Sequence, residues 1–145
     1  MFHVASKYPE EMVKPMREEL TSVGVQELLT PEAVDKAINN PDESTLLIIN
    51  SVCGCAAGNA RPAIRLALEN EILPERITTV FAGVDHEAVA QARAYIHGYP
   101  PSSPSMALFK RGRLVHMIPR HQIEGRMPQE IARDLVNAFN EYCKK

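Results

Sequence analysis

Two cysteines separated by one glycine, Cys53 and Cys55, are the side chains of this sequence best suited to chemistry. They follow the apolar run at residues 46–49 and precede a helix-like segment at residues 60–68. A helix N-terminus offers unpaired backbone N–H groups and the positive end of the helix dipole, which stabilise a thiolate relative to a thiol. The sequence therefore predicts a reactive dithiol at a strand-to-helix junction, with Cys53 at the start of the helix and Cys55 within reach.

The short spacing of the two cysteines indicates how a bond between them would behave. A disulfide between residues i and i+2 closes a small ring that departs from relaxed disulfide geometry. Gly54 supplies the backbone freedom that such a ring demands. Because a strained disulfide is easily reduced, the pair suits an exchanging, catalytic role better than a structural cross-link.

The elements around the dithiol alternate between strand and helix. The first strand is continuously apolar, as a strand buried on both faces should be, and the second is rich in β-branched residues. We expect strands at residues 45–50, 77–81, 106–109 and 114–118, and helices at residues 56–69, 85–96 (with Asp85 as N-cap) and 128–142. This order, with a dithiol after the first strand, predicts a thioredoxin-like α/β fold whose central four-stranded mixed sheet is flanked by helices.

Residues 1–43 are predicted to form a helical extension before a core at residues 44–145, all within one domain. Apolar side chains recur at helical spacing in residues 9–23, but Pro15 should make that helix begin near Lys14 or kink. Thr30 followed by a proline is typical of the start of a second helix. Residues 39–42 should end it.

The composition excludes several classes of partner. The 16 basic and 18 acidic residues give a net charge of −2 and form no runs, so we expect neither nucleic acid nor an anionic membrane surface as a partner. No apolar run is long enough to span a bilayer, and residues 1–5 lack the basic flank of a signal peptide. Three cysteines, two of them almost adjacent, do not form a secreted disulfide framework. The sequence therefore predicts a cytoplasmic protein.

Residues 50–58, together with residues 60–63, 80–83, 101–108 and 118–121, resemble the bacilliredoxin family of thioredoxin-like proteins, and the likeness covers nearly the whole chain. The resemblance implies an oxidoreductase that removes the small thiol bacillithiol from mixed disulfides on client proteins, with weaker disulfide isomerase activity. It makes Cys53 the nucleophile and Cys55 the resolving cysteine. It implies bacillithiol as co-substrate, no tightly bound cofactor, and bacillithiolated client proteins and a reductase system as partners.

The thioredoxin-like resemblance also implies a role for Ser103 and Pro104. In such folds a cis-proline precedes the first strand of the closing hairpin and lies against the dithiol, and Pro104 occupies that place in the sequence. We therefore expect a cis Ser103–Pro104 bond, which would leave the backbone of Ser103 free to pair with an extended substrate.

Other interpretations of the thiols remain open. Cys53 and Cys55 could join Cys143 or a histidine around zinc or copper in a binding module without turnover, although paired zinc ligands usually leave at least two residues between them. A non-catalytic scaffold would require an unreactive dithiol. For Cys143 we expect a peripheral thiol at a frayed helix end, with a second resolving role as the alternative.

The charged residues near the dithiol are expected to have structural or surface roles. Arg61 and Arg65 lie one turn apart on the helix after the dithiol, and a solvated face is favoured over a role in holding the carboxylates of the small thiol. His121 is expected to be structural or a surface residue at the end of the hairpin.

Overall fold

The computed structural model describes residues 6–41 and 43–144. The expectations for residues 1–5 and for Asp42 lie outside these ranges. In chain order the elements are α1 (Glu10–Thr21), β1 (Gln26–Glu27), α2 (Pro31–Ile38), β2 (Ser44–Asn50), the π-helical turn η1 (Ala56–Ala60), α3 (Arg61–Ala67), β3 (Arg76–Phe81), α4 (His86–Ala94), β4 (Ser105–Lys110), β5 (Arg113–Ile118), the 3₁₀ turn η2 (Arg120–Gln122) and α5 (Pro128–Tyr142). No helix within the described ranges is long and apolar enough to cross a membrane.

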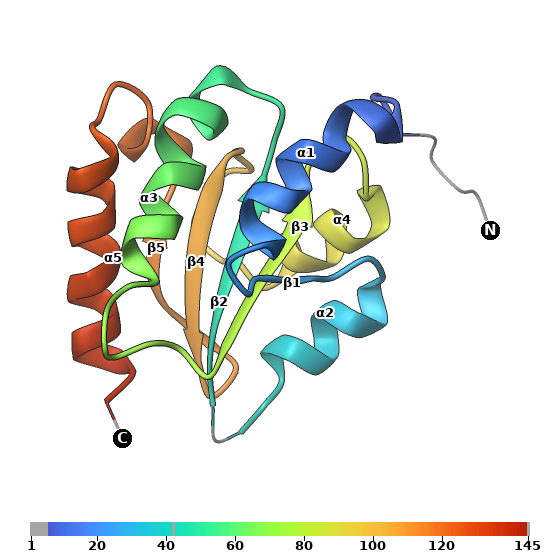
Figure 1. Ribbon diagram of the computed structural model, residues 1–145. Coiled ribbons are helices and arrows are strands. Elements are labelled where there is room, and N and C mark those ends of the chain that lie inside the picture. The colour runs from blue at the N-terminus through green and yellow to red at the C-terminus, as the bar shows by residue number, and fades with distance from the viewer. Residues whose placement is uncertain (1–5, 42, 145) are drawn as a thin grey trace.

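The sheet is mixed and has five strands in the order β1-β3-β2-β4-β5 (Figure 1). As predicted, β2 and β3 are parallel, and β4 pairs antiparallel with β2 and with β5. The predicted sheet of four strands is one strand short, because β1 pairs parallel with β3 as an additional edge strand. With two residues, β1 is too short to show any hydrophobic periodicity.

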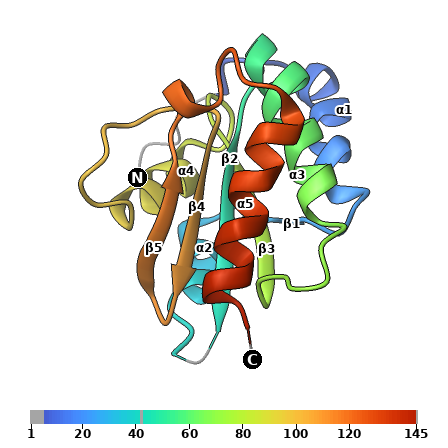
Figure 2. The same cartoon turned by 90° about the vertical axis from the view of Figure 1, so that its left-hand side faces the viewer.

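Helices cover both faces of the sheet, as the two views show (Figures 1 and 2). Every residue of β2 is buried, and its side chains alternate between two hydrophobic clusters. Leu46 and Ile48 belong to the cluster formed with α3 and α5, whereas Leu47 and Ile49 belong to the cluster formed with α2 and α4. The continuously apolar run in the sequence therefore reflects burial on both faces, as expected.

The predicted helix starts are confirmed in α2 and α5 but not in α1. The hydroxyl oxygen of Thr30 accepts a 3.1 Å hydrogen bond from the backbone N–H of Ala33, which caps α2. Helix α5 spans Pro128–Tyr142, as expected. Helix α1 begins at Glu10 and continues through Pro15, which rules out the start near Lys14, whereas the alternative of a kink at Pro15 stays a prediction.

The helix after the dithiol contains a wider turn that was not expected. It begins at Gly54, passes through η1 and continues as α3. In η1 the backbone N–H of Arg61 bonds the carbonyl of Ala56, five residues earlier. Pro62 follows directly, and its ring would clash with the carbonyl four residues earlier in a regular α-helix. The π-helical turn accommodates this proline next to the dithiol.

Candidate active site

Four strand ends meet at one edge of the sheet. Because β2 and β3 are parallel while β4 runs against them, the carboxyl ends of β2, β3 and β5 lie beside the amino end of β4. The segments at these ends carry Cys53, Gly83, Ser103 and Arg120, and all four residues line one cavity. The topology thus gathers residues that are far apart in the sequence around the predicted nucleophile.

The two cysteines of the pair lie close together with no disulfide bond between them. Their Sγ atoms lie 2.7 Å apart and share a hydrogen bond. The backbone N–H of Cys53 donates to the hydroxyl oxygen of Ser51, and its carbonyl accepts from the N–H groups of Ala56 and Ala57 at 2.9 and 3.2 Å. Cys53 therefore sits at the first turn of the helix, as predicted.

The environment separates the pKa values of the two thiols. The hydrogen bond from the Cys55 thiol is the main cause that lowers the pKa of Cys53, and backbone N–H groups and the charge of Arg120 lower it further against the opposing effect of burial. Burial, followed by the hydrogen bond and charge of Cys53, raises the pKa of Cys55 to about 11. Cys53 is thus the thiol of the pair that ionises first, and the protonated Cys55 thiol can donate a hydrogen bond to the Cys53 thiolate.

This arrangement predicts how the reactivity of Cys53 depends on pH. The rate of alkylation of Cys53 should rise as the pH increases through its pKa and level off above it, because only the thiolate attacks. Cys55→Ala removes the hydrogen-bond donor, so the midpoint should move to higher pH, whereas Cys55→Ser keeps an O–H donor and should move it less. The measurement is the rate of iodoacetamide alkylation of Cys53 against pH, resolved by peptide mass. Equal midpoints in the two variants would contradict the role of the hydrogen bond.

Arg120 is the residue that the sequence analysis missed. It follows β5 and Pro119, and its Nη1 donates a 3.3 Å hydrogen bond to the carbonyl of Ser103. Its Nε pairs with the carboxylate of Glu124. The charge of Arg120 acts to lower the pKa of both thiols of the pair. Arg120 lies in the segment at residues 118–121 that resembles the bacilliredoxin family and at the expected end of the hairpin, but neither signal showed that its charge lies beside the dithiol.

Arg61 is buried, so the prediction of a solvated face was wrong for this residue. Its side chain is 2% exposed and donates to the side-chain oxygen of Asn50 at 3.0 Å and to the carbonyl of Ser51 at 2.9 Å. Its Nε also pairs with the carboxylate of Glu19 at 3.1 Å. Arg61 therefore holds the segment between β2 and Cys53. Arg65, one turn later, is exposed as expected.

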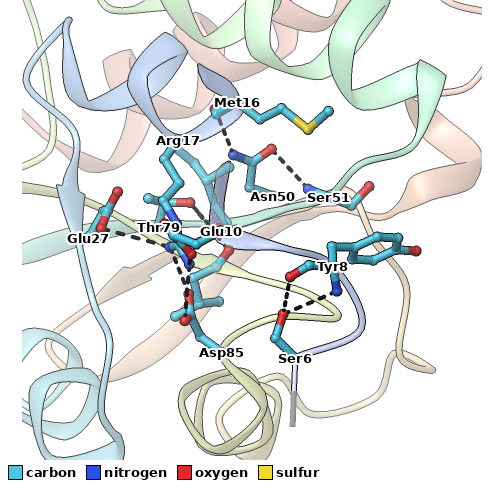
Figure 3. Close-up of polar contacts among 12 residues, drawn as sticks. Ser6, Tyr8, Glu10, Met16, Arg17, Glu27, Asn50, Ser51, Thr79 and Asp85 are labelled. Carbon is cyan, nitrogen blue, oxygen red and sulfur yellow. Dashed lines mark hydrogen bonds and ion pairs between the residues drawn. The ribbon is translucent and has the colours of Figure 1, made fainter. Parts of the chain in front are cut away.

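A second buried arginine fastens α1 to the sheet (Figure 3). Arg17 donates to both carboxylate oxygens of Asp85 at 2.9 and 3.2 Å and pairs with Glu10 at 3.0 Å. Its guanidinium lies over the ring of Phe81, 5.3 Å from the centroid, which is a cation–π contact. Asp85 occupies the predicted N-cap position of α4 but makes no side-chain cap hydrogen bond. Its carboxylate binds Arg17 instead, and this ion pair fixes α1 near the carboxyl end of β3.

The predicted cis bond is present. The Ser103–Pro104 peptide bond is cis, and Pro104 is buried. Ser103 lines the same cavity as Cys53. The prediction of a cis bond is therefore confirmed, whereas the role of Ser103 and Pro104 in substrate binding stays a prediction.

Cys143 is not peripheral, which corrects the expectation. It is 7% exposed, belongs to the cluster of α3 and α5, and has a pKa raised mainly by burial. It lies near Ser44, at the opposite end of β2 from the dithiol. The length of that strand, about 20 Å, separates the two ends, so Cys143 cannot act as a second resolving thiol or as a shared metal ligand with Cys53. Within residues 6–41 and 43–144, no three His, Cys, Asp or Glu side chains form a group that could hold a metal ion.

Comparisons with known proteins identify relatives that match most of the chain. The model of a family described as disulphide isomerase matches residues 8–143. A protein named bacilliredoxin from Salinibacter ruber is 56% identical over 138 residues, which cover 94% of this chain and 81% of that protein. Another, from Halalkalibacterium halodurans, is 52% identical over a match that covers 94% of this chain and 95% of that protein.

Solved structures give the same fold at much lower identity. A thioredoxin from Halobacterium salinarum has a TM-score of 0.57 and 15% identity, covering 85% of this chain and 94% of that chain. Thioredoxin O1 from Arabidopsis thaliana has a TM-score of 0.54 and 14% identity, covering 83% of this chain and 99% of that chain. The predicted thioredoxin-like fold is confirmed.

Proposed function

The chain belongs to the bacilliredoxin family, and on that premise we propose that it is a thiol–disulfide oxidoreductase that removes bacillithiol from mixed disulfides on client proteins. The observation that carries the proposal is the close pair of thiols at the start of a helix, with Sγ atoms 2.7 Å apart and Cys53 lining a cavity. The lowered pKa of Cys53 and the raised pKa of Cys55 support Cys53 as the attacking thiol. A zinc-binding module without turnover is disfavoured because, within residues 6–41 and 43–144, no third His, Cys, Asp or Glu side chain joins the pair to complete a site. The name of the matching family model also supports a disulfide isomerase activity on the same dithiol.

The first step is nucleophilic attack by Cys53. Its thiolate attacks the bacillithiol sulfur of the mixed disulfide, a bond forms between Cys53 and bacillithiol, and the client cysteine leaves as a thiolate. The S–S bond broken is replaced by the S–S bond formed, so no external oxidant or reductant is consumed. Arg120 and the backbone N–H groups of the first helical turn stabilise the attacking thiolate before the reaction.

The second step removes bacillithiol from Cys53. Free bacillithiol attacks the bacillithiol sulfur of the adduct, which forms bacillithiol disulfide and releases the Cys53 thiolate. Alternatively, Cys55 attacks the Cys53 sulfur, which releases bacillithiol as the leaving thiolate and closes the Cys53–Cys55 disulfide for later reduction. Once Cys53 carries bacillithiol, its sulfur is no longer an anion, so its charge no longer raises the pKa of Cys55. Arg120 still favours the Cys55 thiolate. The loss of charge at Cys53 therefore prepares Cys55 to act as the resolving thiol.

We assign Ser103 and Pro104 to substrate binding. Ser103 lines the cavity together with Cys53, and Pro104 anchors it because that ring is buried next to the start of β4. An extended client segment could bond the backbone of Ser103 while its mixed disulfide faces Cys53.

The test of the function uses the Cys55→Ala variant, which can accept bacillithiol but cannot resolve the adduct. The reduced variant is mixed with a bacillithiolated protein, and both intact masses are followed. We expect the mass of one bacillithiol to leave the client and appear on the variant. If the variant gains no mass while the client stays modified, the de-bacillithiolation function is wrong.

A further inference from the structure

The cavity beside Cys53 has dimensions that suit a small molecule. Its volume is about 330 Å³, near the lower end of the range of ligand sites. Cys53 lines it but Cys55 does not. The remaining walls come from separate parts of the chain and include Lys7, Tyr8, Gly83, Ser103 and Arg120.

One wall is the segment that precedes α1. The backbone N–H of Lys7 donates a 2.8 Å hydrogen bond to the carbonyl of Gly83, and the ring of Tyr8 packs on the same glycine. A Cβ atom at Gly83 would lie 3.0 Å from the Tyr8 ring, so a larger residue there would push the ring away. The hydroxyl of Ser6 forms a turn with Tyr8, because it donates to the carbonyl of Tyr8 and accepts from the backbone N–H of Tyr8 (Figure 3). The segment is thus fixed at the edge of the cavity.

Two basic residues, Lys7 and Arg120, line the cavity. No acidic residue within residues 6–41 and 43–144 lines it, although the carboxylate of Glu124 pairs with Arg120 from outside. The hydrogen bonds that Arg120 donates to Glu124 and Ser103 use Nε and Nη1, so Nη2 remains as a donor for a ligand. Lys7 is exposed, and none of the acidic side chains in residues 6–41 and 43–144 pairs with it.

We propose that this cavity binds the small-thiol half of the mixed disulfide and that Lys7 and Arg120 bind its carboxylates. The proposal rests on the proposed function, since it assumes that a small thiol is transferred to Cys53. It explains which sulfur is attacked: a small thiol held in the cavity presents its own sulfur to Cys53 and leaves the client sulfur outside as the leaving group. The two cations select small thiols that carry carboxylates.

The experiment compares two mixed disulfides of the same client peptide. One carries mercaptosuccinate, which has two carboxylates, and the other carries mercaptoethanol, which has none. The rate at which each small thiol moves to Cys53 of the Cys55→Ala protein is measured by intact mass, in the parent and with Lys7→Gln added. Lys36→Gln, which removes an exposed lysine on α2 outside the cavity, is the matched control for net charge.

We expect Lys7→Gln to lower the ratio of the mercaptosuccinate rate to the mercaptoethanol rate about threefold to fivefold. This is the effect expected from the loss of one exposed ion pair. Lys7→Glu should lower it further, and Lys36→Gln should leave it unchanged. Arg120→Gln should slow both transfers, because Arg120 also stabilises the thiolate, but should slow the mercaptosuccinate transfer more.

Two negative results have different meanings. If both small thiols move to Cys53 and the ratio is the same in the parent and in Lys7→Gln, the cavity proposal is wrong while the proposed function stands. If neither mercaptosuccinate, mercaptoethanol nor bacillithiol moves to Cys53 in the parent, the proposed function fails and the cavity proposal fails with it.

Discussion

Cys53→Ser is expected to abolish the transfer of bacillithiol from client to enzyme. A serine hydroxyl does not ionise near neutral pH and cannot form the mixed disulfide, so the rate should fall to that of the uncatalysed exchange, about a thousandfold or more. The bonds from residue 53 to Ser51, Ala56 and Ala57 are made by its backbone N–H and carbonyl, so they do not depend on the sulfur. The serine oxygen can also accept from Cys55, as the sulfur does. The loss should therefore be chemical, with little change in folding.

The matched control is the same substitution two residues later. Cys55→Ser leaves the nucleophile in place, so the first step should persist and the bacillithiol adduct should accumulate on Cys53. Client release is measured by intact mass, and folding of both variants by thermal unfolding. If Cys55→Ser loses the first step and Cys53→Ser keeps it, the two roles are reversed.

The sequence predicted the elements of the fold whose residues carry a strong local pattern. Strand β2 was identifiable from its continuous apolar run and the turn before β5 from its turn residues, and the strand-to-helix position of the dithiol followed from the place of β2. The turn residues Arg111 and Gly112 have positive φ angles of 54° and 76°, as a tight hairpin requires. The two-residue strand β1 has no such pattern and was missed.

The sequence could predict only those residues of the site that are marked by their neighbours in the sequence or by the family resemblance. Cys53, Cys55 and the cis-proline are marked by neighbouring residues or by the family resemblance, whereas Arg120 and Lys7 approach Cys53 only through the folding of distant segments to one edge of the sheet. An arginine on an amphipathic helix usually faces solvent, so Arg61 could not be separated from Arg65 by spacing alone. Arg61 differs from Arg65 because it donates to the side-chain oxygen of Asn50 and to the carbonyl of Ser51. Only the folded chain brings these two oxygens next to Arg61.

Arg61→Met is expected to lower the free energy of unfolding by about 2–4 kcal/mol. Methionine fills part of the space but has no donors, so the buried carbonyl of Ser51 loses its bond to the guanidinium. Glu19 is 41% exposed and can be hydrated instead. Removal of a buried charge also offsets part of the cost, which keeps the expected loss moderate. Urea unfolding followed by circular dichroism measures the change.

Arg65→Met is the matched control because the same substitution falls one turn later on an exposed side chain. It should change the free energy of unfolding by less than about 0.5 kcal/mol. Since Arg61 bonds the segment that orients Cys53 through Ser51, Arg61→Met should also slow alkylation of Cys53 under conditions where the variant remains folded, and Arg65→Met should not. Equal effects of the two substitutions on stability and alkylation would show that Arg61 does not position the nucleophile.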